Sequence, residues 1–187
     1  GTDGDGIADE AERNILSGNL YEVLVAGYET NHTVIAGNYI GTDKTGNVAV
    51  PNGAGIQVRY GAQNTRIGTD GSGDEFNENE RNLISGNSWV GIIVQTPEWW
   101  GLMPPNGITL DGTVIAGNYI GVNADGTAPL GNGSAGIYLP NMATNVRVGT
   151  DGNGTADDVE GNVISSNGGN GIQVEGWSQL RLEAVDQ

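Results

Sequence analysis

The sequence predicts an all-β solenoid, a chain that coils through about five rungs of three short strands each. The first observation is a hexapeptide that occurs five times within 187 residues. The second is a short apolar strand that follows each copy, and the third is a further strand that follows most of these. Strand signals that recur in a fixed order, with Gly and Asn at the corners, are typical of a coiled, repetitive architecture.

The hexapeptides are expected to open the rungs, with one copy in each. They read NILSGN, TVIAGN, NLISGN, TVIAGN and NVISSN, at residues 14–19, 33–38, 82–87, 113–118 and 162–167. Because every copy ends in Asn, we expect one column of stacked asparagines, hydrogen-bonded as an amide ladder. We also expect these asparagines to adopt the left-handed conformation, which Asn tolerates better than other non-Gly residues.

The second and third strands alternate apolar and polar residues, which is the pattern of a strand with one buried face. This alternation predicts that Ile56 and Val58 point inward while Gln57 points outward, and that Ile137 and Leu139 are buried. Rung one is expected to lack a clear third strand. The second strands are EVLV at 22–25, GIQV at 55–58, GIIV at 91–94, GIYL at 136–139 and GIQV at 171–174; the third strands are TRIG at 65–68, GITL at 107–110, VRVG at 146–149 and LRLE at 180–183.

Two kinds of insertion separate the strands. The first kind follows the first strand of a rung, at residues 41–55 and 121–136, and has too few charges for a tight ion site. The second kind joins a third strand to the next rung and is acidic, at residues 1–13, 68–81 and 149–161. An extra segment at 97–106 has no counterpart in the other rungs.

Composition agrees with a narrow solenoid and limits the classes of partner. The chain has 33 Gly, which indicates many tight corners, and 36% hydrophobic residues, which suffice for a thin core of stacked aliphatic side chains. A formal net charge of −16 argues against nucleic acid or an anionic membrane as partner. No run of about 18 apolar residues is present, so no membrane insertion is expected. We interpret residues 1–187 as one domain of a larger repeat protein, whose unpaired end strands would favour end-to-end self-association.

The repeats resemble those of a known family. ISGN followed by GIxV, with GTD-x-x-G loops between, is similar to the right-handed parallel β-helix repeats of secreted or cell-surface proteins of prokaryotes. The resemblance covers nearly the whole chain and implies a right-handed parallel β-helix with an extracellular or cell-surface location. The pectate-lyase-like superfamily includes lyases, glycosidases and many non-catalytic surface proteins, so the resemblance does not fix an activity.

The acidic insertions are the main candidate site. DGDGIADEAE, from Asp3 onward, resembles the calcium loops of thrombospondin type 3 and dockerin repeats. Ca²⁺ takes six to eight oxygen ligands, and alternating Asp in a Gly-rich turn can supply several of them. The alternative is a solvated acidic loop. The expected ligands are Asp3, Asp5, the carbonyl of Ile7, Asp9 and Glu12 in the first loop; Asp70, Asp74 and Glu80 in the second, whose ligand set is ambiguous; and Asp151, Asn153, Asp157 and Glu160 in the third.

Two further features allow a second interpretation. Arg66, Arg147 and Arg181 form an outward column, and pectate-lyase-like enzymes combine Ca²⁺, carboxylates and an arginine base; the alternative, which we prefer, is that each arginine pairs with the neighbouring loop. Trp99 and Trp100 in the extra segment are a candidate ligand-binding platform, for a polysaccharide or a cell-surface protein, or else a local cap.

No catalytic residue is assigned. The sequence therefore favours a non-catalytic, calcium-stabilised structural or adhesive module, and the alternative is a carbohydrate-active β-helix, either a lyase or hydrolase or a glycan-binding unit.

Overall fold

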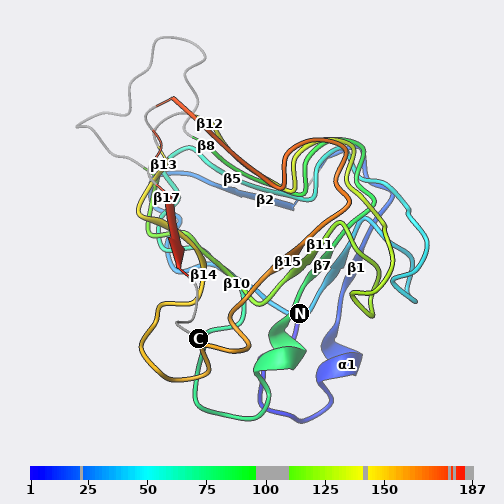
Figure 1. Cartoon of the computed structure of the whole chain (residues 1–187), viewed down its shortest axis with the longest axis horizontal. Helices are drawn as coiled ribbons and strands as arrows, with labels where there is room; N and C mark the ends of the chain where they lie inside the picture. Colours follow the sequence, from blue (N-terminus) through cyan, green and yellow to red (C-terminus); the bar gives the residue numbers. More distant parts are fainter. Residues whose placement is uncertain (22, 96–109, 141–142, 177, 179, 184–187) are drawn as a thin grey trace.

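The computed structural model describes residues 1–21, 23–95, 110–140, 143–176, 178 and 180–183. They form a right-handed parallel β-helix in which three five-stranded parallel sheets make the sides of a prism (Figure 1). Neighbours within each sheet come from successive rungs, so each of five rungs contributes one strand to each sheet. No helix in this described part of the chain is long and apolar enough to cross a membrane.

The strands are short, and their bounds show the repeat. The first sheet contains β1 (Ile15–Leu16), β4 (Tyr39–Ile40), β7 (Leu83–Ile84), β11 (Tyr119–Ile120) and β15 (Val163–Ile164). The second sheet contains β2 (Val23–Ala26), β5 (Ile56–Arg59), β8 (Ile92–Gln95), β12 (Ile137–Pro140) and β16 (Ile172–Glu175). The third sheet contains β3 (Val34–Ile35), β6 (Arg66–Gly68), β10 (Val114–Ala116), β14 (Val146–Gly149) and β17 (Leu180–Glu183).

Four minor elements lie outside these sheets. The strands β9 (Leu110–Asp111) and β13 (Ala143–Thr144) pair with each other at one corner. The helix α1 (Asp9–Glu12) and the 3₁₀ turn η1 (Asn77–Glu80) are single turns within the first two acidic loops. The prediction that residues 107–110 form the third strand of rung three is wrong where it can be tested, because Leu110 belongs to β9 and the third strand of that rung is β10; residues 107–109 lie outside the described part.

The inward positions of the core are as predicted, although Gln57, which was predicted to point outward, is also buried, at 5% exposed. Ile56, Val58, Ile137 and Leu139 are fully buried, and they stack with equivalent residues of the neighbouring rungs. Parallel pairing in register puts each inward side chain directly over its counterpart one rung away, at a spacing of about 4.8 Å. The result is a continuous column of aliphatic side chains inside the prism.

The prediction that each hexapeptide opens a rung is wrong. The copies at 14–19, 82–87 and 162–167 supply strands of the first sheet, whereas those at 33–38 and 113–118 supply strands of the third sheet. The first two copies therefore lie in the same rung, which has a third strand after all, at β3. Both kinds of copy have the same local features, a short β-branched or Leu-rich strand followed by a tight corner, so their sequences alone do not distinguish the two positions.

The asparagines form two ladders, not one. In each ladder the side-chain Nδ2 of one Asn donates to Oδ1 of the next, at 2.8 to 3.1 Å. The left-handed residue is the one before the terminal Asn, Gly in four copies and Ser166 in the fifth, and not the Asn itself. The first ladder is Asn14, Asn38, Asn82, Asn118 and Asn162; the second is Asn19, Asn52, Asn87, Asn132 and Asn167.

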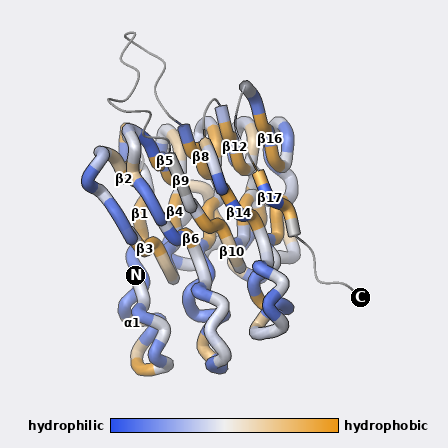
Figure 2. Tube along the Cα trace, turned by 90° about the vertical axis from the view of Figure 1, so that its left-hand side faces the viewer, coloured by the Kyte–Doolittle hydropathy of each residue, from blue (hydrophilic) through white to orange (hydrophobic). Residues whose placement is uncertain are grey.

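The two kinds of insertion alternate along the prism. The acidic loops precede β1, β7 and β15, in rungs one, three and five, and Figure 2 shows them side by side along one edge of the prism. The other loops follow β4 and β11, in rungs two and four. We call rungs one, three and five odd, and rungs two and four even. Loops of one kind are thus two rungs apart and form a row.

Candidate metal centre

Each acidic loop is closed at its base by the same pair of contacts. The hydroxyl of Thr2 donates to Asp9 at 2.5 Å, and that of Thr150 donates to Asp157 at 2.8 Å. Near the end of each loop, the carboxylate of Glu12 or Glu160 accepts the main-chain N–H of Asp3 or Asp151, at 3.2 and 2.9 Å. In the second loop the hydroxyl of Thr69 donates to Asn77 at 2.5 Å, and the main-chain N–H of Asp70 donates to Glu80 at 2.8 Å.

An arginine fastens two of the three loops to the prism. Arg66 Nη1 lies 2.7 Å from Glu80 Oε1, and Arg147 Nη1 lies 3.0 Å from Glu160 Oε1. The same nitrogens donate to the carbonyl oxygens of Gly68 and Gly149, both at 2.6 Å. These contacts support the interpretation that Arg66 and Arg147 are structural partners of the loops.

The outward column that contains these arginines differs from the expected one. In rung three its position is occupied by Val114, which pairs in register with Arg66 and Arg147. Rung one has Val34 at this position and rung five has Arg181. The arginines are therefore not a feature of every rung.

In the first and third loops three carboxylates converge. Oxygen atoms of Asp3, Asp5 and Asp9 all lie within 4.8 Å of one another. In the third loop oxygens of Asp151, Asp157 and Glu160 do the same. Gathering three negative groups this closely is unfavourable unless a cation or several donors offset the repulsion. Carboxylate oxygens are the ligands that Ca²⁺ prefers, so both groups could hold such an ion.

The second loop lacks this convergence. Asn77 occupies the position of Asp9 and Asp157, and its Oδ1 accepts the hydroxyl of Thr69. Asp74 accepts hydrogen bonds from the Ser72 hydroxyl at 2.7 Å and from the Phe76 N–H at 2.9 Å. These two donors, the hydroxyl first, lower the pKa of Asp74 below its usual value of 3.8.

The other predicted ligands are placed less favourably. Glu12 is exposed and is outside the group of three in the first loop. The main-chain N–H of Ile7 donates to Asp5 at 2.7 Å, as the corresponding N–H of Thr155 does to Asn153 Oδ1 at 2.7 Å. The side-chain nitrogen of Asn153 also donates to Asp151. The amide therefore turns its NH₂ group, and not the oxygen that could bind an ion, toward this carboxylate. The sequence could not show which of these predicted ligands lie apart from the carboxylate groups, because the spacing of the residues is the same in the first and third loops.

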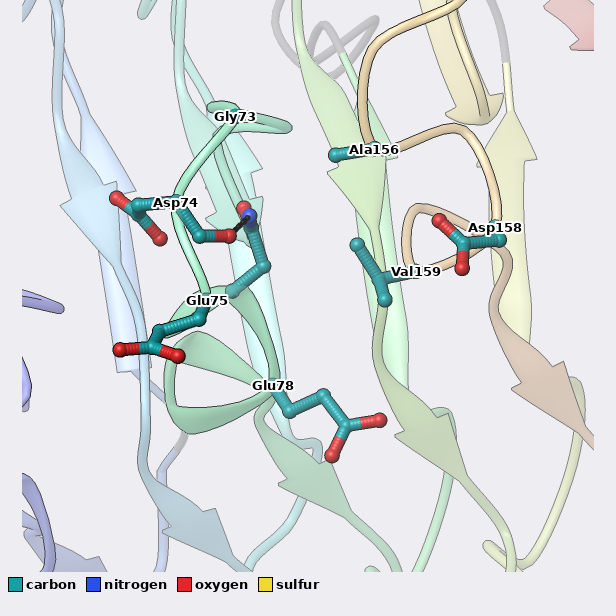
Figure 3. A pocket seen from close by; sticks show the side chains of 8 residues that line it. Gly73, Asp74, Glu75, Glu78, Ala156, Asp158 and Val159 are labelled. Carbon is teal, nitrogen blue, oxygen red and sulfur yellow. Dashed lines mark hydrogen bonds between the residues drawn. The ribbon is translucent and has the colours of Figure 1, made fainter.

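An open cleft of about 320 Å³ separates the second and third acidic loops. In Figure 3 the side chain of Glu78 extends toward the third loop and that of Asp158 extends toward the second. The carboxylate of Glu75 points to the other side of its own loop, so the acidic groups on this rim do not gather at one point. The cleft is an acidic gap between loops and adds no ligand to either group.

A second cluster, which sequence reasoning missed, lies on the outer face of the second sheet. Trp89 is 46% exposed, and its ring centroid lies 6.5 Å from that of Tyr138 in an edge-to-face arrangement. The Tyr138 hydroxyl donates to Glu175 at 2.8 Å, and the Gln173 amide donates to the same carboxylate at 2.6 Å. The Glu175 hydrogen bond raises the pKa of Tyr138, and the hydrogen bonds from Tyr138 and Gln173 lower that of Glu175. The outward alternation at Tyr138 was visible in the sequence, but its partners were not. Trp99 and Trp100 lie outside the described residues.

Comparisons with protein-family models, with curated proteins and with solved structures found no match to this chain.

Proposed function

We propose that this chain is a non-catalytic, calcium-stabilised structural or adhesive module of an extracellular or cell-surface protein. The observation that carries the proposal is the pair of three-carboxylate groups in the first and third acidic loops. They recur at the same corner of the prism, two loops apart, on a fold whose remaining residues are largely periodic. A cation bound to either group would tie that loop closed, in rung one or in rung five.

The choice of Ca²⁺ rests on the chemistry of the donors. All members of both groups are carboxylates, and neither group contains His, which transition metals generally use. The groups lie in irregular, Gly-rich turns, which suit the flexible coordination of Ca²⁺ better than the octahedral geometry that Mg²⁺ demands. We include in this proposal that the acidic loops are related to the calcium loops of thrombospondin type 3 and dockerin repeats.

A structural role is favoured over catalysis because the loops are repeated. A catalytic centre normally joins unlike residues at one place, whereas these acidic groups occur twice in nearly the same form. The arginines that a lyase would use as bases are held by Glu80 and Glu160. An arginine engaged in this way serves to position the loop.

The test is a set of thermal melts in chelator, in millimolar Ca²⁺ and in millimolar Mg²⁺, with the number of bound ions measured by calorimetry. A ligand at 100 times its dissociation constant stabilises the folded state by about 2.7 kcal/mol per site. For a chain of this size that corresponds to roughly 5 to 11 °C per site. We expect two Ca²⁺ ions to bind, and Mg²⁺ to give a much smaller shift.

Matched variants assign the effect to the loops. Asp3→Asn and Asp151→Asn should each remove one bound ion, whereas Asp70→Asn, in the loop without a converging group, should remove none. Equal shifts with Ca²⁺ and Mg²⁺, together with no bound ion in calorimetry, would show that these are solvated acidic loops.

A second candidate function, glycan binding, is favoured by the cluster at Trp89 and Tyr138. An exposed aromatic ring beside a carboxylate and amides is the combination that stacks on a sugar ring and hydrogen-bonds to its hydroxyls. The net charge of −16 favours a neutral over an acidic polysaccharide. This cluster is the specific support for the carbohydrate-binding alternative.

Glycan binding is tested with an array of neutral and acidic polysaccharides. Trp89→Ala should lose binding to any neutral glycan that the unmodified chain retains, whereas Tyr21→Ala, which removes an aromatic ring exposed by 74% in rung one, should not. If no glycan is retained, or if both variants behave alike, the cluster is a local packing feature.

A further inference from the structure

The outer side of rung five, formed by β15, β16 and β17, exposes part of the core. Val174 and Leu182 are 42% and 63% exposed. By strand register they continue two interior columns, in which the preceding residues, Leu139 and Val148, are 0% and 4% exposed. These aliphatic side chains are therefore oriented for burial beneath another rung.

The corresponding side of rung one is less open. Val25 and Ile35 occupy the same two columns, and they are only 5% and 7% exposed. The difference shows that the exposure at rung five is not a general property of a terminal rung in this fold.

Rung five also displays a main-chain donor that the other odd rungs use. The N–H of Gly18 donates to the carbonyl of Val50 at 3.0 Å, and that of Gly86 donates to the carbonyl of Leu130 at 2.9 Å. In both cases the acceptor belongs to the loop of the following even rung. Ser166 is the equivalent residue in rung five and has the same left-handed conformation, with φ of 61°, although a side chain disfavours it. Among the described residues its N–H has no such acceptor.

A side-chain donor repeats this pattern. The hydroxyl of Ser17 donates to the carbonyl of Thr42 at 2.6 Å, and that of Ser85 donates to the carbonyl of Val122 at 2.7 Å. Ser165 is the third member of the series, and its hydroxyl contacts only the hydroxyl of Ser166, at 3.3 Å, within the described part of the chain.

The asparagine ladders end at the same surface. Within the ladders, the main-chain N–H of Asn118 donates to Oδ1 of Asn162, and that of Asn132 donates to Oδ1 of Asn167, each one rung further along. The N–H groups of Asn162 and Asn167 have no equivalent acceptor among the described residues. Rung five thus presents at its corners the donors that, in rung three, bond to the following even rung.

We propose that the outer side of rung five is a docking surface for a further β-helix rung of the even kind. Its occupant is a polypeptide segment with the pattern of residues 117–149, which supplies two ladder asparagines and a loop like that at 121–130. The carbonyl groups of that loop accept the hydrogen bonds of Ser165 and Ser166, and its inward aliphatic side chains cover Val174 and Leu182.

A second copy of this chain fits the surface poorly. Its first rung is odd, so stacking in register places the acidic loop 1–13 one rung, about 4.8 Å, from loop 150–161. Within the chain, acidic loops already touch across two rungs, since Asn79 Nδ2 donates to Asp9 Oδ2 at 2.6 Å. Two loops at half that spacing overlap, and both are acidic.

The experiment adds a rung to the chain. Residues 184–187 are replaced by a copy of residues 117–149, which continues from β17 in the register that links β10 to β11. The matched control carries a copy of residues 150–183 instead, which adds an odd rung of nearly equal length. In chelator, the even extension should raise the melting temperature by at least about 4 °C, lower the binding of a hydrophobic dye, and slow hydrogen exchange at the Ser166 amide.

The odd extension should do none of these things. The proposal is overturned if the odd extension gives equal protection of the Ser166 amide, or if the even extension leaves that amide as fast as in the unextended chain. It is also overturned if the unextended chain forms head-to-tail dimers in sedimentation that protect this amide, because a second copy would then be the occupant.

A coupled substitution tests the specific contact. Ser165→Ala should lower the melting temperature of the even-extended chain by more than that of the unextended chain, because only the former gives this hydroxyl an acceptor. Equal losses in the two chains would contradict the assigned hydrogen bond even if the extension were stabilising.

Discussion

The first and third acidic loops differ from the second in one decisive position. All three share the hydroxyl contact at their base and the Glu contact near their end. The first and third loops have Asp9 and Asp157 where the second has Asn77, and among the described residues only those two gather three carboxylates. A shared loop frame therefore does not require a metal, and the frame and the site can vary independently.

A second difference divides the loops in another way. The second and third loops are fastened by an arginine through Glu80 and Glu160, which are 4% and 1% exposed. The described contacts of Glu12 include no arginine, and this residue is exposed. The first loop thus has carboxylate convergence without the ion pair, the second has the ion pair without convergence, and the third has both. This arrangement allows the two contributions to be separated.

The largest effect is expected from removing the buried glutamate. Glu160→Ala leaves Arg147, which is 16% exposed, without its partner, and breaking a buried ion pair of this kind costs about 3 to 5 kcal/mol. Glu12→Ala is the matched control and should cost much less. Both are measured by denaturant unfolding in chelator, so that no metal contributes. Equal losses would show that the ion pair does not distinguish the loops.

The next effect comes from converting the first loop to the second. Asp9→Asn keeps an acceptor for the Thr2 hydroxyl but removes one of three converging carboxylates. We expect one fewer Ca²⁺ ion per chain and a calcium-dependent stabilisation smaller by about 2.7 kcal/mol at 100 times the dissociation constant. The measurement is calorimetric stoichiometry beside thermal melts. An unchanged stoichiometry would mean that Asp9 is not a ligand.

The reciprocal change, from the second loop to the first, should increase the calcium-dependent stabilisation by a similar or smaller amount. Asn77→Asp places a carboxylate in the second loop beside Asp70 and Glu80, as in the third loop. We expect one additional bound Ca²⁺, with weaker affinity because this loop is one residue longer than the third. Gly73→Asp, in the same loop, is the control, because an added side chain there meets only Thr155, at 3.5 Å. If both variants gain an ion, general acidity and not the loop frame determines binding.

The smallest effect concerns Asp74. The Ser72 hydroxyl lowers the pKa of this carboxyl below 3.8. A carboxyl with a lowered pKa in the folded state adds stability above its unfolded pKa, and this contribution is lost as the pH falls through the lower folded value. Ser72→Ala should therefore raise the pKa of Asp74 toward 3.8, as followed by carbon-detected NMR titration, with little change in stability at neutral pH. A pKa that does not move would assign the shift to the Phe76 amide alone.

The sequence by itself determined the fold class, the number of rungs and the inward residues. Alternation with a period of two depends only on which side of a short strand is apolar, so Ile56, Val58, Ile137 and Leu139 could be placed inside without any knowledge of the sheets. The acidic loops were also located correctly, because an insertion between repeats interrupts a pattern that is otherwise regular.

Only the tertiary structure decided which sheet each hexapeptide joins. TVIAGN and NLISGN have the same local needs, a two- or three-residue strand followed by a left-handed Gly, and a strand this short does not specify its neighbours. Pairing across rungs between residues 24 to 51 positions apart gives the hexapeptides their places and divides the asparagines into two ladders. The same applies to the carboxylates, since the spacing of Asp3, Asp5 and Asp9 is visible in the sequence, but their convergence depends on how the loop closes against the prism.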